Sequence, residues 1–182
     1  MKKISKILVA SLSMIVLCGT SLCANAASSN VNIEIKATAM DNVSVTVPTV
    51  LPIVFNEDGT NTLPTNWSIE NKSTIAGIHL SEVEMYSSDE TWSLLAQTED
   101  TKALPVGTKA MQFSIGKEGA LKLVEPSLGR SSAAGSVNFA ADEISIPSGE
   151  NQVLTFGVKR GAFATAEASA KAFDMVLTFN FN

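Results

Sequence analysis

The sequence has few of the side chains on which most enzyme and metal sites depend. Its 182 residues include one histidine, His79, and two cysteines, Cys18 and Cys23. A single imidazole excludes zinc sites built on paired histidines. A Ser-His-Asp hydrolase would need His79 beside a nucleophile, and the sequence has no Gly-x-Ser-x-Gly turn to carry one. His79 alternates with Ile78 and Leu80, which places it on the solvent face or edge of a strand. We therefore expect no catalysis and no bound cofactor.

Basic side chains are also scarce, at 13 against 18 acidic ones. After residue 26 the only basic residues that adjoin are Lys159 and Arg160. Because binding to a nucleic-acid backbone relies on clustered Lys and Arg that release counterions, we expect no nucleic-acid partner. Hydrophobic residues make up 45% of the chain and charged residues 17%, which predicts a packed domain rather than a disordered chain.

The first 26 residues have the pattern of a secretory signal peptide. Lysines at positions 2, 3 and 6 precede an apolar run over 7–18, and the small residues Ala24-Asn25-Ala26 follow. The run is shorter than the roughly 20 apolar residues that span a membrane, so we predict cleavage near Ala26 and no integral membrane span. Cleavage removes both cysteines and three of the 13 basic residues but none of the 18 acidic ones, which leaves a net charge of −8. We expect a secreted product, either extracellular or held noncovalently at the cell surface.

Alternation of apolar and polar residues with a period of two dominates the rest of the chain. It is clearest at the carboxyl end, where Phe173, Met175, Leu177, Phe179 and Phe181 all fall on odd numbers. Such a pattern predicts strands with one face on a core. Further strands are predicted over 31–37, 43–47, 53–55, 67–71, 75–85, 92–97, 111–115, 121–124, 136–139, 144–147 and 153–158. With about ten short strands and turn residues between them, the sequence predicts an all-β protein, an antiparallel β-sandwich with Greek-key or jelly-roll connections.

The predicted organisation is a single β-sandwich domain over residues 31–182, preceded by a flexible leader at residues 27–30. One segment breaks the alternation. Residues 162–171 are rich in alanine, with Phe163, Ala166 and Ala170 at helical spacing, and we predict a short helix or an extended loop there.

Three aromatic residues, Trp67, Tyr86 and Trp92, are candidates for a sugar-binding platform, because flat rings pack against sugar faces. Trp67 shares its strand face with Ile69, and Trp92 shares its face with Leu94, which favours burial in the core instead. A carbohydrate-binding module that uses these three rings is one alternative function.

Acidic residues provide two further candidates. Glu82 and Glu84 lie two apart on a predicted strand, so their side chains share one face. Paired carboxyl groups are what glycosidases use, and a secreted hydrolase of unrecognised type is a second alternative function. The turn Asn56-Glu57-Asp58-Gly59-Thr60 offers oxygen ligands that suit calcium, but it lacks the spacing of a full calcium loop and also fits a plain Asp-Gly turn.

Two short motifs resemble those of WxL-domain cell-wall-binding proteins. Trp92-Ser93-Leu94 is similar to that family's Trp-x-Leu strand, and Leu177-Thr178-Phe179-Asn180-Phe181 is similar to its second aromatic strand at the carboxyl end. The resemblance implies noncovalent binding to cell-wall polymer.

A second resemblance is to secreted matrix proteins of the camelysin and TasA type, which are β-sandwiches that form fibres. Residues 67–75, followed by residues 78–85, look like that family's paired strands around an Asn-Lys-Ser turn. The resemblance implies that an amino-terminal strand can complete a neighbour's sheet. Here the candidate donor is the strand over residues 31–37, with Val31, Ile33 and Ile35 on one face, and an ordinary first strand is the alternative.

We therefore expect a noncatalytic surface or extracellular-matrix protein, such as a biofilm matrix component, that binds cell-wall polymer or other copies of itself. We predict no catalytic, cofactor-binding or metal-binding residues.

Overall fold

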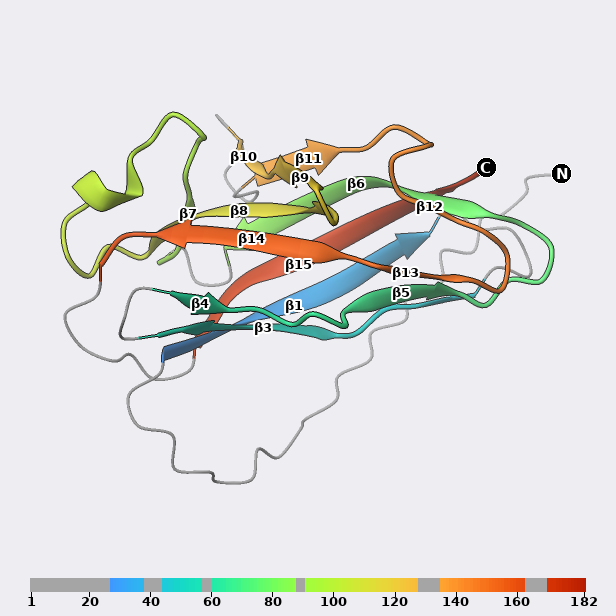
Figure 1. Ribbon diagram of the computed structural model, residues 1–182, viewed down its shortest axis with the longest axis horizontal. Coiled ribbons are helices and arrows are strands. Elements are labelled where there is room, and N and C mark those ends of the chain that lie inside the picture. The colour runs from blue at the N-terminus through green and yellow to red at the C-terminus, as the bar shows by residue number, and fades with distance from the viewer. Residues whose placement is uncertain (1–26, 38–43, 57–59, 88–90, 128–134, 163–169) are drawn as a thin grey trace, which may run out of the picture.

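The computed structural model describes residues 27–37, 44–56, 60–87, 91–127, 135–162 and 170–182. Within these ranges the protein is all-β, which confirms the predicted fold class, and its one helical element is the 3-10 turn η1, Thr101–Ala103 (Figure 1). The predicted signal peptide and most of the predicted helix, residues 163–169, lie outside the described residues. Ala170 and Lys171, where that helix was predicted to end, belong instead to a strand.

The described residues form fifteen strands, and the excess over the predicted ten comes mostly from strands of two or three residues. The strands are β1 Ala27–Ala37, β2 Val45–Thr46, β3 Val50–Phe55, β4 Asn61–Thr62, β5 Ser68–Asn71, β6 Ile78–Ser87, β7 Ser93–Leu94, β8 Ala110–Lys117, β9 Ala120–Leu123, β10 Glu125–Pro126, β11 Gly135–Asn138, β12 Ser145–Ile146, β13 Asn151–Val153, β14 Thr155–Arg160 and β15 Ala170–Phe181.

These strands build the two layers of a sandwich. One layer is an eight-stranded sheet in the order β10-β11-β6-β15-β1-β3-β4, with β12 also paired to β6. The other layer consists of the sheets β13-β5-β2 and β14-β8-β7, with β9 added to β8. The chain passes from β13 to β14 through the single buried residue Leu154, so one length of backbone belongs first to one of these sheets and then to the other.

Strand β1 lies in the middle of the large sheet, between β15 and β3 (Figure 1). It pairs in parallel with β15, the last strand of the chain, and antiparallel with β3. Residues 27–30, which the sequence predicts as a flexible leader, form the start of β1, where Ala27 pairs with Phe55. The sequence of residues 27–30 has no strand pattern, but these residues are held in β1 because they pair with β3, which follows later in the chain.

The core between the layers is filled by alternate side chains, as the sequence predicts. In β15 the side chains of Phe173, Met175, Leu177 and Phe179 are at most 3% exposed, and Phe181 packs against the same core at its edge. From the opposite layer, β8 contributes Phe113 and other residues that are fully buried.

A buried asparagine turns the chain between the layers after β5. The amide Nδ2 of Asn71 donates to the carbonyl oxygens of Ala76, Ile146 and Pro147 at 2.9, 3.1 and 3.2 Å. Its Oδ1 accepts from the backbone N–H of Ser73 at 3.0 Å, and Asn71 is 0% exposed.

This turn corrects one expectation. Residues 67–75 and 78–85 do not form a strand pair, because β5 pairs with β2 and β13 while β6 lies in the other layer. The hydrogen bonds of Asn71 redirect the chain instead of returning it along the same sheet.

Candidate functional site

The three candidate platform aromatics do not form an exposed surface. Trp67 is 3% exposed and meets Phe156 edge to face at 5.4 Å between ring centroids. Trp92 is 5% exposed and stacks on Phe55 at 6.1 Å. Tyr86, on β6, is half-buried. Burial of both tryptophans confirms the core interpretation and removes the flat rings that the platform would need.

The first WxL-like motif packs against β15, the strand whose later residues carry the second motif. Trp92 contacts Phe173 of β15 edge to face, with ring centroids 6.4 Å apart, so the Trp-x-Leu segment packs against the strand that carries the second motif. Leu94, Leu177 and Phe179 are also buried. In this conformation the apolar side chains of both motifs face the core, where they stabilise the sandwich.

His79 and the carboxylates of β6 lie away from the core. The Nδ1 atom of His79 is 2.8 Å from Oδ1 of Asn182, and the ring is half-buried. Glu82 and Glu84 alternate with the buried residues Val83 and Met85, so the two glutamates share a face as predicted. Among the described residues, no three His, Cys, Asp or Glu side chains come together to hold a metal ion.

The calcium prediction falls partly on residues 57–59, which lie outside the described residues. Of the flanking residues, Asn56 donates through Nδ2 to the hydroxyls of Thr60 and Thr62 at 2.9 and 3.2 Å. The Arg160 guanidinium donates to the backbone oxygen of Asn56 at 3.4 Å and covers the Phe55 ring at 4.5 Å. Burial lowers the pKa of Arg160, but a guanidinium stays charged in proteins, and a positive charge at this turn disfavours calcium.

A groove of about 610 Å³ is lined by residues of β8, β9, β10, β11 and β14. Its polar side chains are Gln97, Gln112, Ser114, Lys122, Glu125 and Lys159. The lining holds one carboxylate, so this groove does not present the carboxyl pair that glycoside hydrolysis uses. Gln112 is engaged with the protein itself, because its Nε2 donates to the carbonyl oxygens of Ala96 and Glu99 at 2.8 and 3.0 Å.

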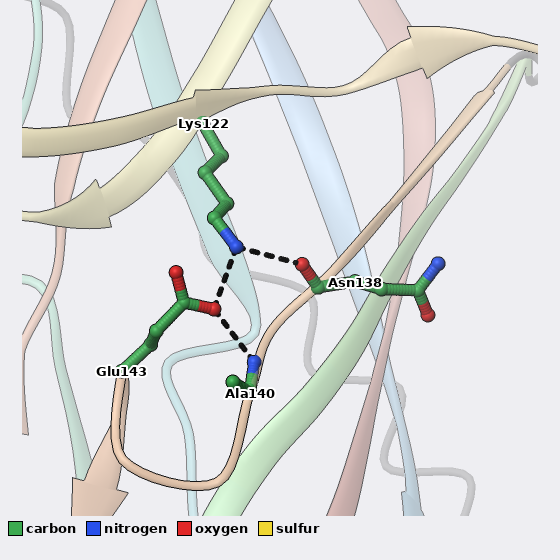
Figure 2. A network of polar contacts seen from close by, with 4 residues as sticks. All are labelled: Lys122, Asn138, Ala140 and Glu143. Atoms are coloured by element: carbon green, nitrogen blue, oxygen red, sulfur yellow. Dashed lines mark hydrogen bonds and ion pairs between the residues drawn. The ribbon is translucent and has the colours of Figure 1, made fainter.

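Lys122 and Glu143 join the two layers beside this groove. The Nζ atom of Lys122, on β9, donates to Oε2 of Glu143 at 2.6 Å and to the carbonyl oxygen of Asn138 at 3.2 Å (Figure 2). The same Oε2 accepts from the backbone N–H of Ala140 at 2.6 Å. Lys122 also covers the ring of the buried Phe139, so the ion pair closes this edge of the sandwich.

These contacts make the ion pair sensitive to acid. The hydrogen bond from Lys122, then that from the Ala140 N–H, lowers the pKa of Glu143 below the ordinary value of a glutamate. A lowered pKa in the folded state means that the pair contributes stability above the unfolded-state pKa and that this contribution is lost as the pH falls through the folded-state pKa.

We expect Glu143→Gln to unfold at a lower urea concentration than the wild type at pH 7. The difference should shrink as the pH falls below the unfolded-state pKa of the carboxyl group, because the protonated acid, like the amide, carries no charge. Glu118→Gln, at the exposed β8–β9 turn, is the control and should differ little from the wild type at either pH. Equal urea midpoints for Glu143→Gln and the wild type at pH 7 would contradict a stabilising role for this pair.

The candidate assembly site is the position of β1, which we call the β1 slot: the space between β15 and β3. Val31 stands opposite both Leu51 and Phe173, Ile33 opposite Met175, and Ile35 opposite Leu177. All four of these partner residues are 0% exposed, and Ile33 packs against the core. The three positions predicted for a strand donor are therefore in register with the most deeply buried part of the large sheet.

Several important residues were not found from the sequence. Asn71 lies in the Asn-Lys-Ser segment, but nothing there shows that its amide is buried. Lys122 lies between Leu121 and Leu123, and this alternation places its side chain on the face of β9 opposite to the two leucines. It does not identify a partner. Glu143 follows Asp142 in a turn and carries no local signal for a partner 21 residues away.

A search of known protein families, curated proteins and solved structures finds no match to this chain. Among the described residues, no helix has the length and apolar character needed to cross a bilayer.

Proposed function

We propose that this chain is an exported, noncatalytic structural protein whose copies associate by exchanging strand β1. Of the two associations that the sequence predicts, with cell-wall polymer and with other copies, the second is the one that a particular element of the fold supports. That observation is the central position of the first described strand, which pairs with β15 from Ser29 to Ala37 and with β3 from Ala27 to Asn32.

The slot and its strand form a self-complementary pair. Each copy carries one β1 and one slot, so the backbone hydrogen bonds and the packing of Ile33 on the core are the same whether β1 comes from its own chain or from another. An added strand gains affinity from main-chain hydrogen bonds and specificity from alternate side chains, here at the level of Leu51, Phe173 and Met175.

The topology also makes β1 separable from the rest of the sandwich. Only the chain after Ala37 joins β1 to the body, since the predicted cleavage near Ala26 would leave its other end free. A strand held by one connection can leave the slot without breaking the connections of any other strand. Without it, β15 and β3 would expose unpaired backbone groups in the middle of a sheet, which favours capture of another strand.

A register-specific disulfide tests strand exchange. Asn32 pairs with Asp174 across the β1–β15 interface, and neighbouring strands bring such positions within disulfide reach. We expect Asn32→Cys and Asp174→Cys chains that begin at Ala27, and so carry no other cysteine, to form a mixed disulfide dimer when refolded together and oxidised. Non-reducing electrophoresis and mass spectrometry detect the product.

Thr178→Cys is the matched control, because this β15 residue pairs with Lys36, four positions farther along β1. Mixed with Asn32→Cys, it should give little cross-linked product. If the Asp174 mixture also stays monomeric, β1 remains in its own chain and the proposed association is wrong.

A further inference from the structure

Strand β1 ends, and strand β2 begins, at the same end of the sandwich. Ala37, the last residue of β1, stands opposite Phe179 near the end of β15, where the backbone N–H of Asn182 donates to Gly77 at 3.1 Å. In the other layer, the backbone N–H of Lys72 donates to the backbone oxygen of Ser44, the residue just before β2, at 2.8 Å.

Asn71 ties these two sides together. It pairs with Val45 of β2 and donates through its amide to Ala76, the neighbour of Gly77. We call this end, with Ser44, Asn71, Ala76 and Gly77, the linker end. Figure 1 shows the end of β1, the tip of β5, β12 and the carboxyl terminus gathered on the same side.

The connection between β1 and β2 is short. From Ala37 to Ser44 there are seven residue steps, which reach at most about 25 Å when fully extended. When β1 is donated, its last residue, Ala37, lies at the acceptor's linker end, whereas Ser44 lies at the donor's linker end. The connection between them keeps these two ends within that distance. Donor and acceptor must meet through the same end of the molecule.

From this geometry we infer that strand exchange is reciprocal and produces a closed, two-fold dimer. The inference rests on the proposed exchange of β1. When two copies face each other through identical ends, the contact is isologous, and the second copy's β1 lies beside the first copy's empty slot. Both slots are then filled and no donor strand is left to extend a fibre. A head-to-tail fibre would instead need the donated strand to leave the acceptor at one end of the sandwich and to enter the donor's body at the opposite end.

The linker end also carries the most exposed large apolar side chain among the described residues. Ile75, between Asn71 and Gly77, is 66% exposed. In a two-fold contact through this end, Ile75 of each copy lies on the surface that faces the other copy, where burial of its side chain favours association. The partner that fits this surface is thus a second copy of the same chain.

Placing both cysteines in one chain distinguishes the possible products. For the Asn32→Cys/Asp174→Cys chain that begins at Ala27, we expect a covalent dimer with two interchain disulfides after oxidation. A ladder of trimers and larger species would overturn the closed dimer and leave strand exchange standing. Monomers with an intrachain disulfide would overturn the proposed function together with this inference.

A second variant locates the contact without cross-linking. Ile75→Asp places two carboxylates at the two-fold contact and should weaken dimerisation by about tenfold or more in sedimentation equilibrium. The control is Val106→Asp, since Val106 is 63% exposed and lies in the loop that contacts Ala162, before the start of β15. Weakening by Val106→Asp but not by Ile75→Asp would place the contact elsewhere and overturn the inference.

Discussion

Replacement of Leu177 by alanine is expected to lower the free energy of unfolding by about 2–5 kcal/mol. Leu177 is 0% exposed in β15, opposite Val83 of β6 and in register with β1 on its other side. Alanine removes buried methyl groups and leaves a cavity that close-packed neighbours fill only in part. For a chain of this size, each kcal/mol lowers the melting temperature by roughly 2–4 °C, which thermal unfolding followed by circular dichroism measures.

Thr178→Ala, the next residue, is the matched control. Thr178 is half-buried on the opposite face of β15, and its backbone oxygen, which accepts from Ser81 at 3.0 Å, is retained. Its effect should stay within about 0.5 kcal/mol, as is usual for substitutions near the surface. An unchanged melting temperature for Leu177→Ala would contradict the burial of alternate residues on which the sandwich depends.

Replacement of Asn71 is expected to destabilise the protein by more than about 3 kcal/mol, because several buried groups lose their partner and each costs about 1–3 kcal/mol. Asn71→Ala leaves the carbonyl oxygens of Ala76, Ile146 and Pro147 and the N–H of Ser73 without this side chain. Asn71→Asp keeps the shape but turns a carboxylate oxygen toward those carbonyls, so it should be at least as harmful at pH 7. Urea unfolding measures both variants.

The exposed Asn138 supplies the control for this second prediction. In Figure 2 its side chain points away from Lys122, which is bound by the Asn138 backbone oxygen instead. Asn138→Ala should therefore cost little. If Asn71→Asp were as stable as the wild type, the amide could not be the group that holds the turn between the layers.

Local periodicity explains why much of the fold was predictable. Neighbouring residues of a strand point to opposite faces, so the run from Phe173 to Phe179 reveals which face meets the core without knowledge of the partner strand. It does not reveal that Val176, on the other face, is also buried at 3% exposure. The same reasoning placed Trp67 and Trp92 among apolar neighbours, and both are buried.

Pairing between distant segments could not be predicted in this way. Residues 27–30 carry no strand pattern, yet they belong to β1 because β3 supplies hydrogen-bonding partners. Likewise, the sequence predicts both β5 and β6 as strands, but it does not predict that the chain changes layer between them. That change depends on the buried contacts of Asn71. The ion pair of Lys122 and Glu143 depends on the same long-range packing.

The sequence by itself determined that this chain forms strands and which faces of them are buried, because both follow from side-chain direction along a short length of backbone. Only the tertiary structure decided that β1, the first strand of the described residues, lies in the middle of a sheet, in parallel with β15. Backbone hydrogen bonds are chemically alike at every residue, so the choice of partner depends on how the whole core packs.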